Sequence, residues 1–268
     1  MEFRTVERAG VKLGSRRGFL QGITAGLFAG HAGAGLLADE SAPHPLVAAI
    51  RIARQSVGRI AAHPGYSCVF AKKEVVDDHM IEQTIALKVR HNPFSVYMYF
   101  REPRAGREVI FVEGKNENRL LVHETGLASL IGTLALAPED PRVRAENRHP
   151  ITKAGIVRTV EAQMAIWESE RQYGETEVRY FEDAKLGEMV CKVVESNHPQ
   201  PRKQFAFQTT RLWIDVKTGY PVRLQQYAFP KKQGTKGPLV EDYSFTELKT
   251  DVELTDRDFD VENPAYNF

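Results

Sequence analysis

Short strand-like segments fill two long blocks of this chain, and tight polar turns separate most of them. The first block holds segments 66–76, 80–90, 94–100, 108–113 and 119–123. The second block holds segments 177–181, 188–195, 204–216, 220–229 and 239–249. Strands joined by a few residues pair as antiparallel neighbours, because a parallel pair needs a crossover of about a dozen residues or more. The two blocks therefore predict an antiparallel sheet.

Helical periodicity precedes the first block and separates it from the second. Apolar residues recur at three- and four-residue spacing over 46–61, over the short segment 127–134 and over 152–173. An order of helix, strands, helices and strands is typical of an α+β fold, in which the helices gather on one face of the sheet.

The segment 108–113 adds a further constraint, because both of its faces are apolar. Val109 and Phe111 occupy one face, and Ile110 and Val112 occupy the other. A strand of this kind is covered on two sides, so we expect a helix over one face and either core or ligand against the other. A curled sheet with helices packed in or over its concave face meets this requirement.

The first 38 residues have the pattern of an export signal. The stretch Ser15-Arg16-Arg17-Gly18-Phe19-Leu20 resembles the twin-arginine signal, an address that the export machinery reads. A glycine-rich apolar run and small residues follow, as in a cleavable leader. The run is too polar and too rich in glycine for a membrane-spanning helix, which needs about 20 mostly apolar residues.

Cleavage after Ala34 or after Ala38 would leave a mature chain outside the cytoplasm. We expect one domain over 39–268, periplasmic or otherwise extracytoplasmic, with no transmembrane segment. The leader holds five of the 36 basic and two of the 35 acidic residues, so the mature chain is slightly acidic and is not built to bind nucleic acid. Cys68 and Cys191 can pair in an oxidising compartment or remain buried thiols; the sequence leaves both open.

No motif in the chain assigns it a reaction. The sequence lacks G-x-S-x-G, H-E-x-x-H, a P-loop, G-x-G-x-x-G and C-x-x-C, so we predict no catalytic residue, no metal site and no cofactor. His123 with Glu124 has the composition of a general base and its orienting carboxylate, but no motif places a nucleophile beside them. Arg148 and His149 lie in the basic stretch 141–153, which can hold an anion or serve as a solvated connector.

Large apolar side chains gather in the predicted strands. On the inside of a curled sheet they form either a packed core or an apolar pocket. Phe205 and Phe207 have the opposite parity to Leu212 and Ile214, which predicts a bulge or a change of buried face within 204–216. The residues that we assign to a ligand pocket are Phe94, Val96, Met98, Phe100, Phe111, Phe205, Phe207, Trp213 and Tyr243, with Arg148, His149 and His123 as polar candidates.

Several stretches resemble known families. Residues 97–126, 147–156 (NRHPITKAGI) and 212–227 (LWIDVKTGYPVRLQQY) resemble an exported bacterial family, domain of unknown function 1571. Stretches 212–227 and 243–261 are also similar to the LolA/LolB-like superfamily of outer-membrane lipoprotein carriers. That similarity implies an incomplete, half-open antiparallel barrel, with helices closing the mouth over an apolar cavity for acyl chains. It assigns no functional residues to this chain.

These observations favour a non-enzymatic, exported cell-envelope protein that binds or carries an apolar ligand such as an acyl chain, a lipid or a lipoprotein. An alternative is a structural or partner-binding envelope module with a fully packed interior. A third hypothesis is a hydrolase that uses His123 or the loop at Arg148 and His149. A void between sheet and helices supports the binder, and a nucleophile within hydrogen-bond reach of His123 would support the hydrolase.

Overall fold

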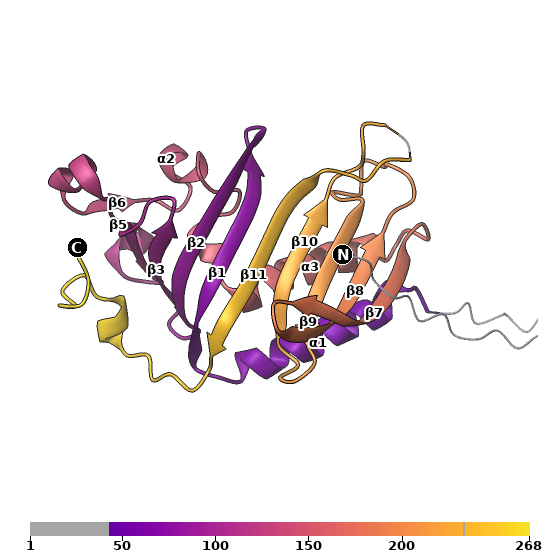
Figure 1. Cartoon of the computed structure of the whole chain (residues 1–268), viewed down its shortest axis with the longest axis horizontal. Helices are drawn as coiled ribbons and strands as arrows, with labels where there is room; N and C mark the ends of the chain where they lie inside the picture. The colour runs from indigo at the N-terminus through magenta and orange to yellow at the C-terminus, as the bar shows by residue number, and fades with distance from the viewer. Residues whose placement is uncertain (1–42, 233) are drawn as a thin grey trace, which may run out of the picture.

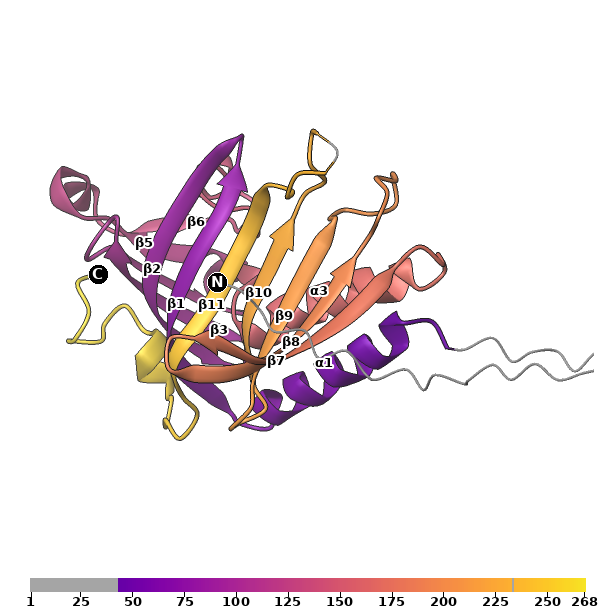
Figure 2. The same cartoon turned by 45° about the vertical axis from the view of Figure 1, so that its right-hand side comes forward.

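One curved sheet organises the described part of the chain, which in this computed structural model comprises residues 43–232 and 234–268. The predicted leader, with Arg16, Arg17 and both cleavage sites, lies outside the described residues. Within them, eleven strands follow the order β6-β5-β4-β3-β2-β1-β11-β10-β9-β8-β7, and each pairing is antiparallel. Figures 1 and 2 show the sheet curling around the helices on its concave side. The predicted α+β class is confirmed.

The elements have the following bounds. The strands are β1 (Gly65–Val76), β2 (His79–Arg90), β3 (Ser95–Glu102), β4 (Glu108–Val112), β5 (Leu120–His123), β6 (Leu134–Leu136), β7 (Glu177–Leu186), β8 (Met189–Asn197), β9 (Thr209–Asp215), β10 (Pro221–Tyr227) and β11 (Leu239–Lys249). The helices are α1 (Leu46–Ala61), α2 (Pro141–Arg144) and α3 (Ile156–Glu170), with short 3-10 turns η1 (Asn116–Asn118), η2 (Gly126–Ile131), η3 (Ile151–Lys153) and η4 (Asp256–Phe259).

The strand pair β1 and β11 lies at the centre of the sheet, although the two strands come from opposite ends of the described chain (Figure 1). Strands β1 to β6 build one half of the sheet in chain order, and β7 to β11 build the other half. Across the central pair, the rings of Phe70 and Phe245 stack with their centroids 4.8 Å apart. The last strand therefore joins the two halves into one layer.

Helices α1 and α3 cover the inner face of the second half of the sheet. Leu46 of α1 and Trp167 of α3 pack in one cluster with Leu212 and Leu224 of the sheet. Trp167 is fully buried, and its indole N–H donates to Ser196 Oγ at 2.9 Å. The N–H is the only polar group of the indole, so burial of Trp167 leaves no polar atom without a partner, and its large apolar area stabilises the fold.

The C-terminal segment covers the outer face of β3 and β4. Phe259 packs with Tyr97, Ile110 and Val112, and the ring of Tyr266 stacks on Tyr97 at 4.0 Å. The prediction that strand 108–113 is covered on both sides is therefore confirmed. On the outer face the cover is the C-terminal segment, and no helix of the central region takes that place.

Three local predictions were wrong. Segment 127–134 is the 3-10 turn η2 followed by β6, because residues 125–138 lack a buried face long enough to stabilise a regular helix. Helix α3 begins at Ile156 and not at 152, since Gly155 has a φ of 89°, which a helix cannot continue through. Residues 204–208 lie outside the sheet, so β9 begins only at Thr209. This late start explains the change of parity within 204–216.

The two cysteines do not pair. Both thiols are free and buried. Cys68 lies in the core beneath the concave face, whereas Cys191 packs with Trp213 in a separate cluster. Over the described residues, no helix combines the length and the apolar character needed to cross a bilayer.

Candidate functional site

A cavity of about 230 Å³ lies between the concave face of the sheet and the segment that runs from the end of α2 into α3. Its lining comes from β1, β2, β3, β4, β5, β10 and β11 with Arg107 and Phe207 on one side, and from residues 143–166 on the other. It exceeds the engineered apolar cavity of about 150 Å³ that binds benzene. The interior between sheet and helices is therefore hollow over this region.

One wall of the cavity is apolar. Met98 and Phe100 of β3, Val109 of β4, and Leu120 and Val122 of β5 line it. They share the concave face because side chains alternate between the two faces of each strand. Met98 is only partly buried although it lies mid-strand, which indicates that no protein side chain fills the space before it.

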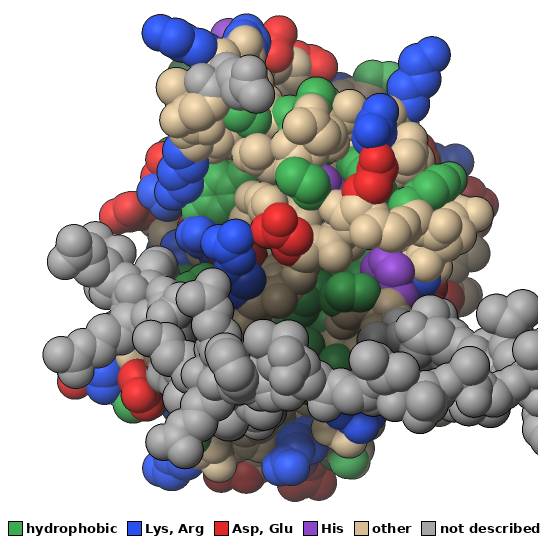
Figure 3. Space-filling model, turned by 90° about the vertical axis from the view of Figure 1, so that its right-hand side faces the viewer, with side chains coloured by type: hydrophobic (Ala, Val, Ile, Leu, Met, Phe, Trp, Pro, Cys, Tyr) green, Lys and Arg blue, Asp and Glu red, His purple; other side chains and the backbone are tan. Residues whose placement is uncertain are grey.

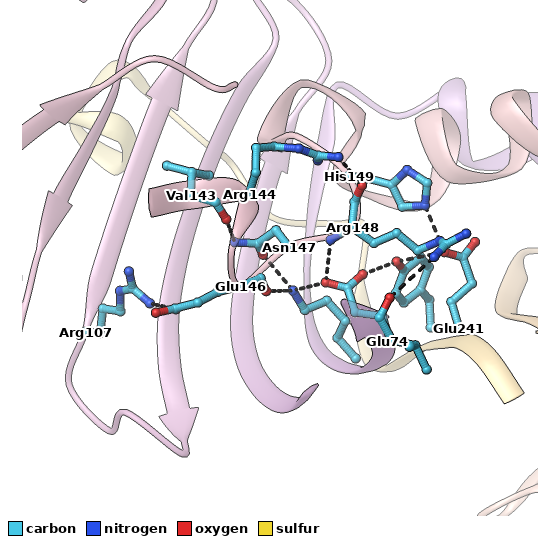
Figure 4. A network of polar contacts seen from close by, with 12 residues as sticks. Glu74, Arg107, Val143, Arg144, Glu146, Asn147, Arg148, His149 and Glu241 are labelled. Carbon is cyan, nitrogen blue, oxygen red and sulfur yellow. Dashed lines mark hydrogen bonds and ion pairs between the residues drawn. The ribbon is translucent and has the colours of Figure 1, made fainter. Parts of the chain in front are cut away.

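The opposite end of the cavity is polar, and its centre is a buried ion pair on β1. Lys72 Nζ lies 2.8 Å from Glu74 Oε1, and the two side chains are 7% and 1% exposed. Lys72 also donates to Asn147 Oδ1 at 2.7 Å, and the backbone N–H of Arg148 donates to Glu74 Oε1 at 3.0 Å. Figure 4 shows how these contacts fasten the loop after α2 to the sheet.

Tyr243 of β11 lies between two carboxylates. Its hydroxyl contacts Glu74 Oε2 and also Glu241 Oε2, the latter at 3.2 Å. Burial raises the pKa of Tyr243, and the charges of Glu241 and Glu74 raise it further. The phenol therefore keeps its single proton and can donate it to only one carboxylate at a time.

Glu241 is balanced by two residues of the loop. His149 Nε2 lies 2.8 Å from Glu241 Oε2, and Arg148 Nε lies 3.4 Å from the same oxygen. Glu241 is 4% exposed, whereas Arg148 is 37% and His149 47% exposed. The loop thus presents basic groups outward while the sheet holds the carboxylate inside.

The pKa values of the buried pair shift in the same direction. Burial lowers the pKa of Lys72, and the charge of Glu74 only partly opposes this. Burial alone would raise the pKa of Glu74, but Lys72, the Tyr243 hydroxyl and the Arg148 N–H together hold it below the usual value. At neutral pH the carboxylate is charged and fully hydrogen-bonded, which makes it a structural group and a poor general acid.

A second polar contact lies deeper, between α3 and β10. Gln226 Nε2 donates to Gln163 Oε1 at 2.5 Å. Both side chains are buried and line the cavity. In the described part of the chain, Gln163 Nε2 and Gln226 Oε1 are left without a partner, so the cavity wall retains one unused donor and one unused acceptor.

The structure brings six of the predicted site residues together around the cavity: Met98, Phe100, Phe207, Tyr243, Arg148 and His149. Phe94 lines a second, smaller cavity of about 170 Å³. The guanidinium of Arg158, which also lines this cavity, stacks on the ring of Phe94. Val96 and Phe111 are buried in the surrounding core.

The remaining predicted residues lie elsewhere. Phe205 stacks on the imidazole of His198 at 3.7 Å, in the stretch between β8 and β9. Trp213 packs on the outer face with Val193 and Val222. His123 ends β5 and lies beside Phe268, with ring centroids 6.1 Å apart. Among the described residues, no cluster of three or more His, Cys, Asp or Glu side chains could hold a metal ion.

Sequence reasoning missed the charged residues that the sheet contributes to the polar half of the cavity, Lys72, Glu74 and Glu241. Lys72 and Glu74 share their strand parity with the buried Cys68 and Phe70, and that parity could have placed them on the inner face. Glu241 likewise shares parity with Tyr243. The pairing of Gln163 with Gln226 joins residues 63 positions apart, and no pattern in the sequence signals it.

The described chain resembles several solved structures. One is the Mycobacterium tuberculosis lipoprotein LppX, with 11% identity, a TM-score of 0.44, and coverage of 78% of this chain and 99% of that chain. Another is LprF from Mycobacterium bovis, with 11% identity, a TM-score of 0.41, and coverage of 79% and 98%. A third is a LolA superfamily protein from Nitrosomonas europaea, with 12% identity, a TM-score of 0.33, and coverage of 78% and 96%. A comparison with curated proteins finds no match.

The sequence resemblance to domain of unknown function 1571 is confirmed over most of the chain. The family pattern matches residues 63–268. This range contains the whole sheet, helix α3 and every residue that lines the cavity, from Phe70 to Tyr243. The chain therefore belongs to the family described as "Protein of unknown function (DUF1571)".

Proposed function

We propose that this protein is an exported cell-envelope protein that binds an apolar ligand between its sheet and helices, and that it catalyses no reaction. The ligand would be an acyl chain of a lipid or a lipoprotein. The observation that carries the proposal is the cavity of about 230 Å³ with an apolar wall built by β3, β4 and β5. A structural module with a packed interior would leave no such space.

The energetics of an acyl chain fit this cavity. Each methylene that leaves water for an apolar site contributes about 0.8 kcal/mol, so five buried methylenes would contribute about 4 kcal/mol. The polar side chains of Lys72, Glu74 and Tyr243, which line the cavity, are already bonded to one another. They therefore need no catalytic role to account for their presence.

The export part of the proposal concerns residues 1–38 and the twin-arginine machinery as a partner. We propose that the mature protein spans 39–268 as one domain in the periplasm or otherwise outside the cytoplasm. Trp213 and His123, which lie away from the cavity, are not part of the proposed ligand site. Support for a hydrolase is weaker, because His123 lies beside Phe268 and does not line the cavity.

The cavity can be filled by one substitution at its mouth. Ala162 lines the cavity from the exposed side of α3, while Ala165 on the same helix is exposed and does not line it. Ala162→Trp should weaken the binding of a fluorescent fatty acid at least tenfold, and Ala165→Trp should leave binding within twofold. Equal binding by both variants, or no acyl species on mass spectrometry of lipid extracted from the purified protein, would count against an acyl ligand in this cavity.

A further inference from the structure

The cavity opens where its lining residues reach solvent. Among the lining residues, His149, Lys153 and Ala162 are exposed, and the others are partly or fully buried. The mouth therefore lies between the loop at 148–153 and the middle of α3. Figure 3 shows one end of the molecule, which is hollowed, with hydrophobic side chains visible inside the hollow and charged groups around it.

Acidic and basic lining groups differ in how far they reach solvent. The acidic lining residues, Glu74 and Glu241, are 1% and 4% exposed and already bonded to Lys72, Tyr243, Arg148 and His149. The lining charges that do reach solvent are basic: Arg148 at 37%, Arg158 at 33%, and the exposed Lys153. The charged groups of the lining that a solute meets at the mouth are therefore basic.

Two of these basic groups keep hydrogen-bond donors that a further anion can use. The guanidinium of Arg148 has only long contacts, at 3.4 Å to Glu241 Oε2 and 3.4 Å to the carbonyl of Val75. Within the described residues, Lys153 has no ion-pair partner. Arg158 is different, because it lies 3.5 Å from Glu113 Oε2, stacks on Phe94 at 3.6 Å and donates to the Thr152 carbonyl at 2.8 Å. Arg158 is thus held in place, and Glu113 partly offsets its charge.

We propose that the ligand is an anionic amphiphile whose oxyanion, a carboxylate or a phosphate, is held at the mouth by Arg148 and Lys153 while its chain lies against the apolar wall. This inference rests on the proposed function and adds the charge of the headgroup to it. Charge-assisted hydrogen bonds from a guanidinium and an ammonium to an oxyanion are stronger than those to a neutral group. The headgroup would stay near water, where its desolvation costs little.

Probes with one chain length and different headgroups test the inference. Dodecanoate and dodecyl phosphate should bind the purified protein at least tenfold more tightly than dodecanol or dodecyltrimethylammonium, measured by calorimetry at low salt below micelle formation. The advantage should shrink as salt is added. The double variant Arg148→Gln with Lys153→Gln should lose about tenfold for the anions and stay within twofold for dodecanol. Arg142→Gln, which removes an exposed charge of the neighbouring helix α2 that does not line the cavity, should change neither.

The outcomes separate the two proposals. Equal affinity for dodecanoate and dodecanol would overturn the anionic headgroup and leave an apolar ligand standing. Competition by acetate or inorganic phosphate alone would show a site for free anions and would also overturn it. A failure of all dodecyl probes to bind would overturn the proposed function, and this inference with it.

Discussion

The buried pair Lys72 and Glu74 provides the sharpest test of how the cavity is built. Lys72→Met removes the ammonium and leaves the carboxylate of Glu74, 1% exposed, inside the protein. Breaking a buried ion pair from one side costs about 3–5 kcal/mol. Glu74 keeps its bonds from the Tyr243 hydroxyl and the Arg148 N–H, so we expect the lower end, about 3 kcal/mol.

The assay is urea unfolding followed by tryptophan fluorescence, since both tryptophans, Trp167 and Trp213, are buried. The double variant Lys72→Met with Glu74→Gln should recover about 2 kcal/mol, because it removes the unpaired charge. The matched control is Lys73→Met on the same strand. Lys73 lies 2.7 Å from Glu82, but these side chains are 48% and 58% exposed, so the loss should stay below about 1 kcal/mol.

The same pair predicts how stability depends on pH. The folded-state pKa of Glu74 lies below its usual value of 4.5, so its contribution is present above that pH and is lost as the pH falls through the folded pKa. In Lys72→Met, burial then raises the pKa of Glu74, and the penalty should be largest near pH 7 and shrink towards pH 5. A loss for Lys72→Met no larger than that for Lys73→Met would refute the argument that a desolvated charge pair holds the loop.

Three further predictions follow from other parts of the fold. Ellman's reagent should find two thiols after unfolding and almost none in the folded protein, because Cys68 and Cys191 are free and buried and burial raises the pKa of Cys191 to about 11; fewer than two thiols after unfolding would indicate a bridge. Burial and the nearby Cys68 raise the pKa of Tyr66 well above 10.0. Tyr66→Phe should therefore leave the ultraviolet absorbance rise from tyrosine ionisation unchanged up to about pH 11. A smaller absorbance rise in the variant would contradict this. Phe259→Ala should cost about 3 kcal/mol of unfolding free energy, since Phe259 is 5% exposed. Leu130→Ala, at a side chain 84% exposed, should cost less than about 0.5 kcal/mol. Similar unfolding midpoints for the two variants would contradict the packing of the C-terminal segment on the sheet.

Much of the fold could be predicted from local patterns. The periodicity of 46–61 coincides with α1, and the strand predicted at 239–249 is β11. The helical spacing of Leu127, Leu130 and Ile131 predicted a helix, but no other element buries these side chains, which are 70–88% exposed. Hydrophobic spacing predicts a helix only where another element buries the stripe.

The site was less predictable than the fold, for a physical reason. Met98 and Phe100 follow from alternation along one strand. The contacts of Glu74 with Arg148 and Tyr243 join positions 74 and 169 residues apart, and they depend on the pairing of β1 with β11. Charged residues in a strand are ordinarily expected to face water, so the buried Lys72 and Glu74 ran against that expectation.

The central position of β11 has a consequence for how the chain reaches its native state. A polypeptide that stops before residue 239 would present two long unpaired strands, β1 and β10, where the sheet should be continuous. Such edges recruit other strands and favour aggregation. The continuous native layer can therefore form only once synthesis has passed the last strand.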